Sequence, residues 1–135
     1  MKKLRILVAD DQASFRQEMQ EVTQSILGLS VVAEAHNAPE AIELVKQHHP
    51  NIVLVDIVMP KMSGIEATRC IKEIAPETKI IAITAYDNTE FPKRSIEAGA
   101  DLFIKKEKLD SETLRECLEK LSNPNDKEPN PKGGS

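Results

Sequence analysis

Short apolar runs alternate along the chain with longer stretches whose apolar residues recur every three or four positions. The short runs are rich in Val and Ile, which is typical of strands buried on both faces of a sheet. The longer stretches have the spacing of amphipathic helices. This alternation predicts an α/β fold, a doubly wound parallel sheet with helices on both faces. The five predicted strands are residues 5–9, 31–35, 52–56, 79–84 and 102–105.

Four of the longer stretches carry clear apolar stripes, and a fifth is weaker. The four stripes are Phe15, Met19, Val22 and Ile26; Ala38, Ala41, Ile42 and Val45; Ala67, Ile71 and Ile74; and Leu114, Cys117, Leu118 and Leu121. The fifth stretch, residues 88–98, has few apolar residues and contains Pro92, so we expect a short helix that begins near Pro92. With few apolar contacts, it is predicted to be the most mobile of the five helices.

Residues 1–121 are predicted to form one domain, and the composition changes after them. The segment 122–135 holds three of the eight prolines and two of the five glycines, with no apolar residue. Such a composition cannot bury enough apolar surface to fold, so we predict a disordered tail or an interdomain linker there.

The overall composition narrows the class of protein. The chain has 135 residues, 40% of them hydrophobic, and a formal net charge of −4, which excludes a general nucleic-acid coat and predicts no nucleic-acid contact by this segment. The apolar run near the N-terminus ends at Asp10, too soon for a secretory signal, and no run predicts a membrane span. The two cysteines lack a C-x-x-C spacing and are expected to be buried thiols, which favours a cytoplasmic location.

Polar residues stand at the ends of four of the five apolar runs. Functional groups of an open parallel sheet gather beyond the carboxyl ends of its strands. Three acids, one hydroxyl and one amine are therefore expected to converge at this edge. The residues at these ends are Asp10 and Asp11, Asp56, Thr84, and Lys105 and Lys106.

Three converging carboxylates require positive charge nearby. Each pair repels by about 4 kcal/mol at about 4 Å and an effective dielectric constant of about 20. One lysine against three carboxylates leaves a charge of −2, which a single divalent cation would cancel. A site with one or two carboxylate ligands and several waters is typical of Mg²⁺, so the sequence predicts a Mg²⁺ site.

Asp56 is the candidate nucleophile of this cluster. A carboxylate beside Mg²⁺, an amine and a hydroxyl is suited to accept a phosphoryl group. Asp56 ends the central and most apolar run, and Met59-Pro60 then leads into a loop that we expect to end at Gly64.

The same residues lie in segments that resemble a known family. The segments are the acidic pair at 10–11, VDIVMPKMSGIEA at 55–67, ITA at 83–85 and AGADLFIKK at 98–106. They are similar to the receiver domain of two-component response regulators, the CheY-like superfamily, and the resemblance covers roughly residues 3–121. It implies a flavodoxin-like strand order of 2-1-3-4-5 with five helices.

The resemblance also implies a signalling function for Asp56. A sensor histidine kinase, or a small phosphodonor such as acetyl phosphate, would supply a phosphoryl group to Asp56 in the presence of Mg²⁺. Asp11, Asp56 and the backbone carbonyl of Val58 would ligate the ion, and Asp10 would act mainly through water. The domain would catalyse its own phosphorylation and dephosphorylation without being an enzyme in the usual sense.

Further residues match the family's response to phosphorylation. By resemblance, Thr84 and Lys106 would hold the phosphoryl oxygens, and Thr84 and Phe103 would switch conformation. Lys105 is expected to point away from Lys106 into solvent. The fourth helix, fifth strand and fifth helix would then present an altered face to a partner.

Two further residues are expected near the mouth of the pocket, and the residue after Lys106 differs from the family's usual one. In family members the residues that match Val58 and Tyr86 line the mouth of the pocket. The family's lysine is usually followed by proline, often through a cis bond, but Glu107 follows Lys106 here. A cis bond before a residue other than proline costs several kcal/mol, which argues against that geometry.

Two other functions remain as alternatives. A Mg²⁺-dependent aspartyl-phosphate phosphatase would need a second aspartate two residues after Asp56, where Val58 stands. A flavodoxin-like carrier of FMN would need a first loop that embraces phosphate, which Asp10 and Asp11 would repel.

The sequence leaves open which molecule the receiver would act on. The segment 64–67 resembles receivers that precede a DNA-binding helix-turn-helix domain. One interpretation is therefore that the chain is the receiver part of a transcriptional regulator with its own C-terminal output domain. A stand-alone receiver that docks on a downstream effector is equally compatible with the sequence. A phosphorylation-dependent dimer is a further option.

Overall fold

The computed structural model describes residues 4–122 and contains five strands and five α-helices. The strands are β1 (Leu4–Ala9), β2 (Leu29–Ala35), β3 (Ile52–Asp56), β4 (Lys79–Thr84) and β5 (Leu102–Lys105). The helices are α1 (Ala13–Gln24), α2 (Ala38–His48), α3 (Gly64–Ile74), α4 (Glu90–Glu97) and α5 (Ser111–Ser122), and a 3₁₀ turn, η1 (Lys106–Lys108), follows β5. The predicted tail, residues 122–135, lies outside the described residues except for Ser122, the last residue of α5.

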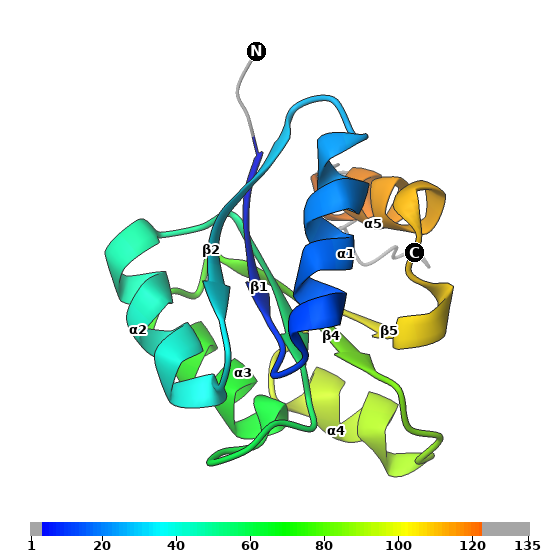
Figure 1. Ribbon diagram of the computed structural model, residues 1–135. Helices are drawn as coiled ribbons and strands as arrows, with labels where there is room; N and C mark the ends of the chain where they lie inside the picture. Colours follow the sequence, from blue (N-terminus) through cyan, green and yellow to red (C-terminus); the bar gives the residue numbers. More distant parts are fainter. Residues whose placement is uncertain (1–3, 123–135) are drawn as a thin grey trace, which may run out of the picture.

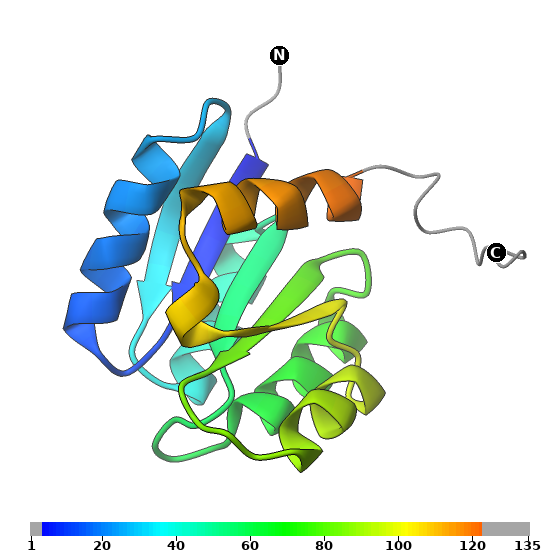
Figure 2. The ribbon, with the colours of Figure 1, turned by 90° about the vertical axis from the view of Figure 1, so that its right-hand side faces the viewer.

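The strands form one parallel sheet in the order β2-β1-β3-β4-β5, as the family resemblance implied. Helices α1 and α5 cover one face of the sheet, and α2, α3 and α4 cover the other (Figures 1 and 2). The predicted α/β fold class is therefore confirmed, and the strands end at one edge of the sheet.

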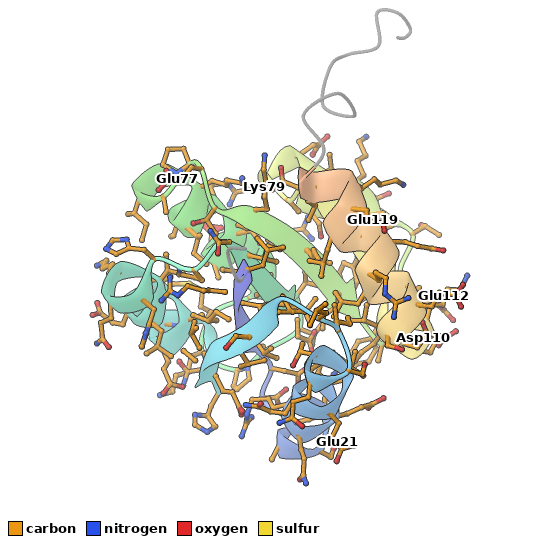
Figure 3. All side chains as sticks on the ribbon, turned by 90° about the horizontal axis from the view of Figure 1, so that it is seen from above. Glu21, Glu77, Lys79, Asp110, Glu112 and Glu119 are labelled. Carbon is orange, nitrogen blue, oxygen red and sulfur yellow. The ribbon has the colours of Figure 1, made fainter. Side chains whose placement is uncertain are left out.

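Each face of the sheet has its own apolar core. In β1, Ile6 and Val8 pack into the core beneath α1 and α5, whereas Leu7 and Ala9 pack into the core beneath α2 and α3. This alternation follows from the two-residue period of a strand. Both faces are buried, which is why the central strands read as continuous apolar runs. Charged side chains lie around the outside of the layers, such as Glu21 on α1 and Glu119 on α5 (Figure 3).

Two helices differ from the predicted pattern. Helix α1 ends at Gln24, so Ile26 lies beyond it, in the turn that leads to Gly28. Gly28 has a φ of 86°, a conformation that favours glycine and that turns the chain into β2. Helix α4 begins at Glu90, so Pro92 lies in its first turn, where a missing N–H breaks no helical bond.

The remaining expectations about the chain concern peptide geometry and membrane spans. No peptide bond within the described residues is cis, so the bond between Lys106 and Glu107 is trans. Among residues 4–122 there is no helix with the length and apolar character that crossing a membrane requires.

Candidate functional site

Three aspartates meet at the carboxyl edge of the sheet. Asp10 and Asp11 follow β1, and Asp56 is the last residue of β3, the strand beside β1. Each offers a carboxylate oxygen, and these oxygens lie within 4.8 Å of one another. Asp10 is fully buried and Asp56 is 5% exposed, whereas Asp11 is exposed. The strand ends therefore bring together the three acids that the sequence predicted to converge.

Lys106 reaches this cluster from the residue after β5. Its Nζ lies 2.7 Å from Oδ2 of Asp10 and 3.2 Å from Oδ2 of Asp56, so one ammonium bridges two carboxylates. The preceding residue, Lys105, points away, as strand alternation requires. It was expected to be solvated, but its ammonium pairs with the exposed carboxylate of Asp87 in the loop after β4.

The backbone around Asp56 is held tightly. Its Oδ1 accepts a hydrogen bond of 2.9 Å from the N–H of Val58, and the N–H of Gly64 donates to the carbonyl of Ile57 over 2.9 Å. A Cβ atom at Gly64 would lie 2.2 Å from the carbonyl oxygen of Asp56. Only glycine therefore fits at this close approach, and Gly64 ends the loop after Asp56 as predicted.

Burial and neighbouring charges shift the pKa values of two residues in the cluster. Burial raises the pKa of Asp56 to about 6 from 3.8, the Asp10 carboxylate adds to this, and the Val58 N–H and Lys106 oppose it. Burial lowers the pKa of Lys106, but the contacts with Asp10 and Asp56 outweigh it and raise the pKa above its ordinary 10.5. Lys106 is therefore a permanent cation, and Asp56 is held in the carboxylate form at some cost near neutral pH.

The donor set fits a hard divalent cation. All three groups offer carboxylate oxygens, which are the ligands that Mg²⁺ prefers. Among residues 4–122, the buried Oδ2 of Asp10 has no hydrogen-bond donor apart from its ion-pair partner, the Lys106 ammonium. Three carboxylates and one ammonium leave a charge of −2. The residues present thus fit the Mg²⁺ site that the sequence predicted.

A cleft of about 390 Å³ opens beside the cluster. Asp11, Asp56 and Lys106 line it, together with Val58 and Tyr86, so the last two lie at its mouth as predicted. Tyr86 is 59% exposed and Val58 is 38% exposed. The two side chains therefore leave the cleft accessible to a small molecule or a partner's side chain.

Of the two predicted switch residues, Thr84 directly precedes the cleft residue Ala85, and Phe103 lines a separate groove. Thr84 is fully buried at the end of β4, and its Oγ1 accepts a hydrogen bond of 3.1 Å from the N–H of Tyr86. Phe103 in β5 is half-buried and packs against the core beneath α2, α3 and α4. It also lines a second groove with Tyr86 and Pro92.

Sequence reasoning missed three residues that contact the cluster. Gln12 accepts a hydrogen bond of 3.2 Å from Lys106, and the ring centroid of Phe15 lies 4.5 Å from Lys106 Nζ. Arg16 lies on the buried face of α1 and donates to the carbonyl of Asp10 over 2.7 Å. A signal existed for a basic partner such as Arg16, because Glu34 is the one acid within the apolar run 31–35, and an acid that is partly removed from water favours a partner.

Comparison with known proteins identifies a family. Residues 6–119 match the family described as "Response regulator receiver domain". The chain is 37% identical to the chemotaxis protein CheY of Bacillus subtilis (strain 168), over 88% of this chain and 98% of CheY. It is 36% identical to the transcriptional regulatory protein YxjL of the same organism, over 83% of this chain and 51% of YxjL.

Solved structures show the same likeness. The signal receiver domain of the response regulator NarL from Mycobacterium tuberculosis superimposes with a TM-score of 0.84 at 27% identity, over 91% of this chain and 99% of that domain. The chain spans about half the length of the regulators YxjL, DegU and GacA that it matches, and nearly all of CheY.

Proposed function

Because this chain belongs to the response regulator receiver domain family, we propose that it is the phosphoacceptor switch of a two-component system. Asp56 accepts the phosphoryl group. The observation that carries this proposal is the bridge of Lys106 between Asp10 and Asp56, in a cluster whose carboxylate oxygens lie within 4.8 Å. Asp56 is among the residues that line the cleft, which gives a phosphodonor a route to its carboxylate.

In the chemical step, an oxygen of the Asp56 carboxylate attacks the phosphorus of the donor. A new O–P bond forms, giving a mixed anhydride, and the bond between phosphorus and the leaving group breaks. The electron pair of that bond departs with the leaving group, which is acetate from acetyl phosphate or imidazole from a phosphorylated histidine. A pKa of about 6 leaves Asp56 ionised near neutral pH, as this attack requires.

Asp11, Asp56 and the backbone carbonyl of Val58 are proposed to hold Mg²⁺, with Asp10 acting mainly through water. When bound, Mg²⁺ neutralises charge on the phosphoryl oxygens. The burial of Asp10 and its pairing with Lys106 support a less direct role for this residue than for exposed Asp11.

The response to phosphorylation is proposed to begin at Thr84 and Lys106. Lys106 carries its charge into the cleft and can pair with a phosphoryl oxygen, and the Thr84 hydroxyl can donate to another. Phe103 and Thr84 then change conformation together. The groove shared by Phe103, Tyr86 and Pro92 supports this coupling, because it joins β5 to the loop before α4.

The partners follow from the family. A sensor histidine kinase is the proposed phosphodonor, in the cytoplasm, and the face formed by α4, β5 and α5 is the proposed output surface. The matched relatives include a chemotaxis protein and transcriptional regulators. We propose that the same switch acts on a downstream effector or on a C-terminal output domain, and that phosphorylation can favour a dimer. The phosphatase alternative has no support here, because Val58 provides no acid.

The test is labelling with acetyl phosphate and Mg²⁺, followed by intact mass measurement. The wild-type chain should gain one phosphoryl group, and Asp56→Asn should gain none. Asp87→Asn is the matched control, because Asp87 lies in the loop after β4, where it lines the separate groove with Phe103 and is outside the cluster. Unchanged labelling of Asp56→Asn would refute the assignment of the acceptor.

A further inference from the structure

A partly buried ion pair, formed by a buried arginine and a half-buried glutamate, lies behind the acidic cluster and has no part in the chemistry described above. Arg16 of α1 is only 8% exposed, and its Nε donates to Oε1 of Glu34 in β2 over 3.1 Å. The other oxygen of Glu34 accepts a hydrogen bond of 2.7 Å from the side chain of Gln20, one turn further along α1. Both carboxylate oxygens of Glu34 are thus engaged by α1.

The guanidinium of Arg16 also contacts the carboxyl edge of the sheet, where Asp10 lies. Its Nη1 donates to the carbonyl of Asp10 over 2.7 Å. The N–H of Asp10 pairs with the carbonyl of Ala35 in β2, and its Oδ1 accepts from the N–H of Gln12 over 2.8 Å. Asp10 is therefore held at its N–H, its carbonyl and one carboxylate oxygen. Its second oxygen, Oδ2, is left facing Lys106.

Arg16 supports a turn that has no helix-capping side chain of its own. The N-cap residue of α1, Gln12, makes no side-chain capping bond, and no acid lies in the first turn of the helix. The turn that carries Asp10 and Asp11 therefore has little local support beyond the bond from the Gln12 N–H. The planar guanidinium can bind a carboxylate and a carbonyl at the same time, which an ammonium does less well.

Stability alone does not account for this arrangement. Removing a guanidinium from water is costly, and replacing a largely buried ion pair with apolar side chains is often neutral or stabilising. Residues behind a metal site commonly fix the orientation of its ligands, and their loss lowers metal affinity. Such a role is consistent with a charge placed on the buried face of α1, beside Phe15 and Met19.

We infer that Arg16, held by Glu34, is a positioning residue that fixes the turn carrying Asp10 and Asp11 in the geometry that receives Mg²⁺. The inference rests on the proposed function, because it concerns the same cation. Arg16 bonds to the carboxylate of Glu34 and the backbone carbonyl of Asp10, and it would not itself be a ligand of the cation. It acts through the carbonyl of Asp10, so its loss lowers Mg²⁺ affinity more than it lowers the rate at saturating Mg²⁺.

The test measures Mg²⁺ dissociation constants on folded protein. Tyr86 is the chain's single tyrosine, there is no tryptophan, and Tyr86 lines the cleft, so its fluorescence reports binding. Arg16→Met is expected to weaken binding about tenfold, and Arg16→Lys by less. Arg69→Met is the matched control, because Arg69 pairs with Glu66 on the exposed side of α3 and should leave binding unchanged.

A double variant separates weakened binding from destabilisation of the fold. Arg16→Met combined with Glu34→Met removes both charges, so no unpaired charge stays buried, and it should still show the tenfold weakening. Hydrogen exchange without metal gives a second readout, because the Gln12 amide should exchange faster in these variants.

The outcomes separate the inference from the proposed function. Wild-type affinity in the folded Arg16 variants, with unchanged Gln12 exchange, would overturn the positioning role and leave the function intact. A wild-type chain that binds no Mg²⁺ and takes no phosphoryl group would overturn the proposed function itself.

Discussion

The replacement Asp56→Asn should stabilise the metal-free protein near neutral pH. Asn is nearly the same size as Asp and keeps an oxygen that can accept the Val58 N–H. It removes a carboxylate that the fold holds beside Asp10 in a buried position. The variant therefore isolates the electrostatic cost of the acidic cluster from its packing.

The magnitude follows from the pKa of the Asp56 carboxyl, about 6 in the fold against an ordinary 3.8. Each pKa unit corresponds to about 1.4 kcal/mol, so the ionised carboxylate costs up to about 3 kcal/mol. Water in the adjoining cleft screens part of this, and we expect a gain of about 1–2 kcal/mol in the free energy of unfolding.

The pH dependence has a definite sign. A raised folded-state pKa means that the folded protein binds the proton more tightly than the unfolded chain does. Ionised Asp56 therefore costs nothing below about pH 4, and the cost is complete above about pH 6. The advantage of Asp56→Asn should grow across this window and vanish at its acid end.

The assay is urea unfolding followed by circular dichroism, with a chelator present, at several pH values across this window. Asp87→Asn is the control, because pairing with Lys105 lowers the pKa of Asp87 and its loss should bring no gain. Added Mg²⁺ should stabilise the wild type and Asp87→Asn, but not Asp56→Asn, by about 1.4 kcal/mol at ten times the dissociation constant. Equal stability at neutral pH, or a gain that does not depend on pH, would refute the reasoning.

Three further predictions concern the same site. Lys106→Ala should impair the response to phosphorylation far more than Lys105→Ala, because only Lys106 contacts the cluster, and equal effects in a partner-binding assay would contradict this. Gly64→Ala should lower the free energy of unfolding by about 1–3 kcal/mol and slow labelling by acetyl phosphate, because its Cβ meets the Asp56 carbonyl. Its control, Ser63→Ala, loses a helix cap worth about 1 kcal/mol and should label normally. Calorimetric titration should show Mg²⁺ affinity falling about fivefold from about pH 6 to about pH 5, because protons compete for Asp56, and a constant affinity would argue against the raised pKa.

The positions of the strands could be predicted closely from the sequence. Strands β3, β4 and β5 have the predicted bounds, because runs buried on both faces are apolar at every position. Helix ends were predicted less well, as the last turn before Gly28 shows. An apolar residue such as Ile26 can be buried whether it continues a helix or lies in the turn after it.

By itself, the sequence determined that acids and an amine would gather at one edge of the sheet. This follows from chain direction, because parallel strands all end at the same edge. The different environments of Asp10 and Asp11 were decided only in the tertiary structure, where one is buried against Lys106 and the other faces the cleft.

The tertiary structure also decided which residues support the acids. Arg16 and Glu34 are distant in sequence and meet only because α1 packs beside β2. Periodicity reports whether a position is buried, and it does not report which charged group lies opposite. Such pairings depend on how two elements are placed relative to each other, and only the packed fold fixes that placement.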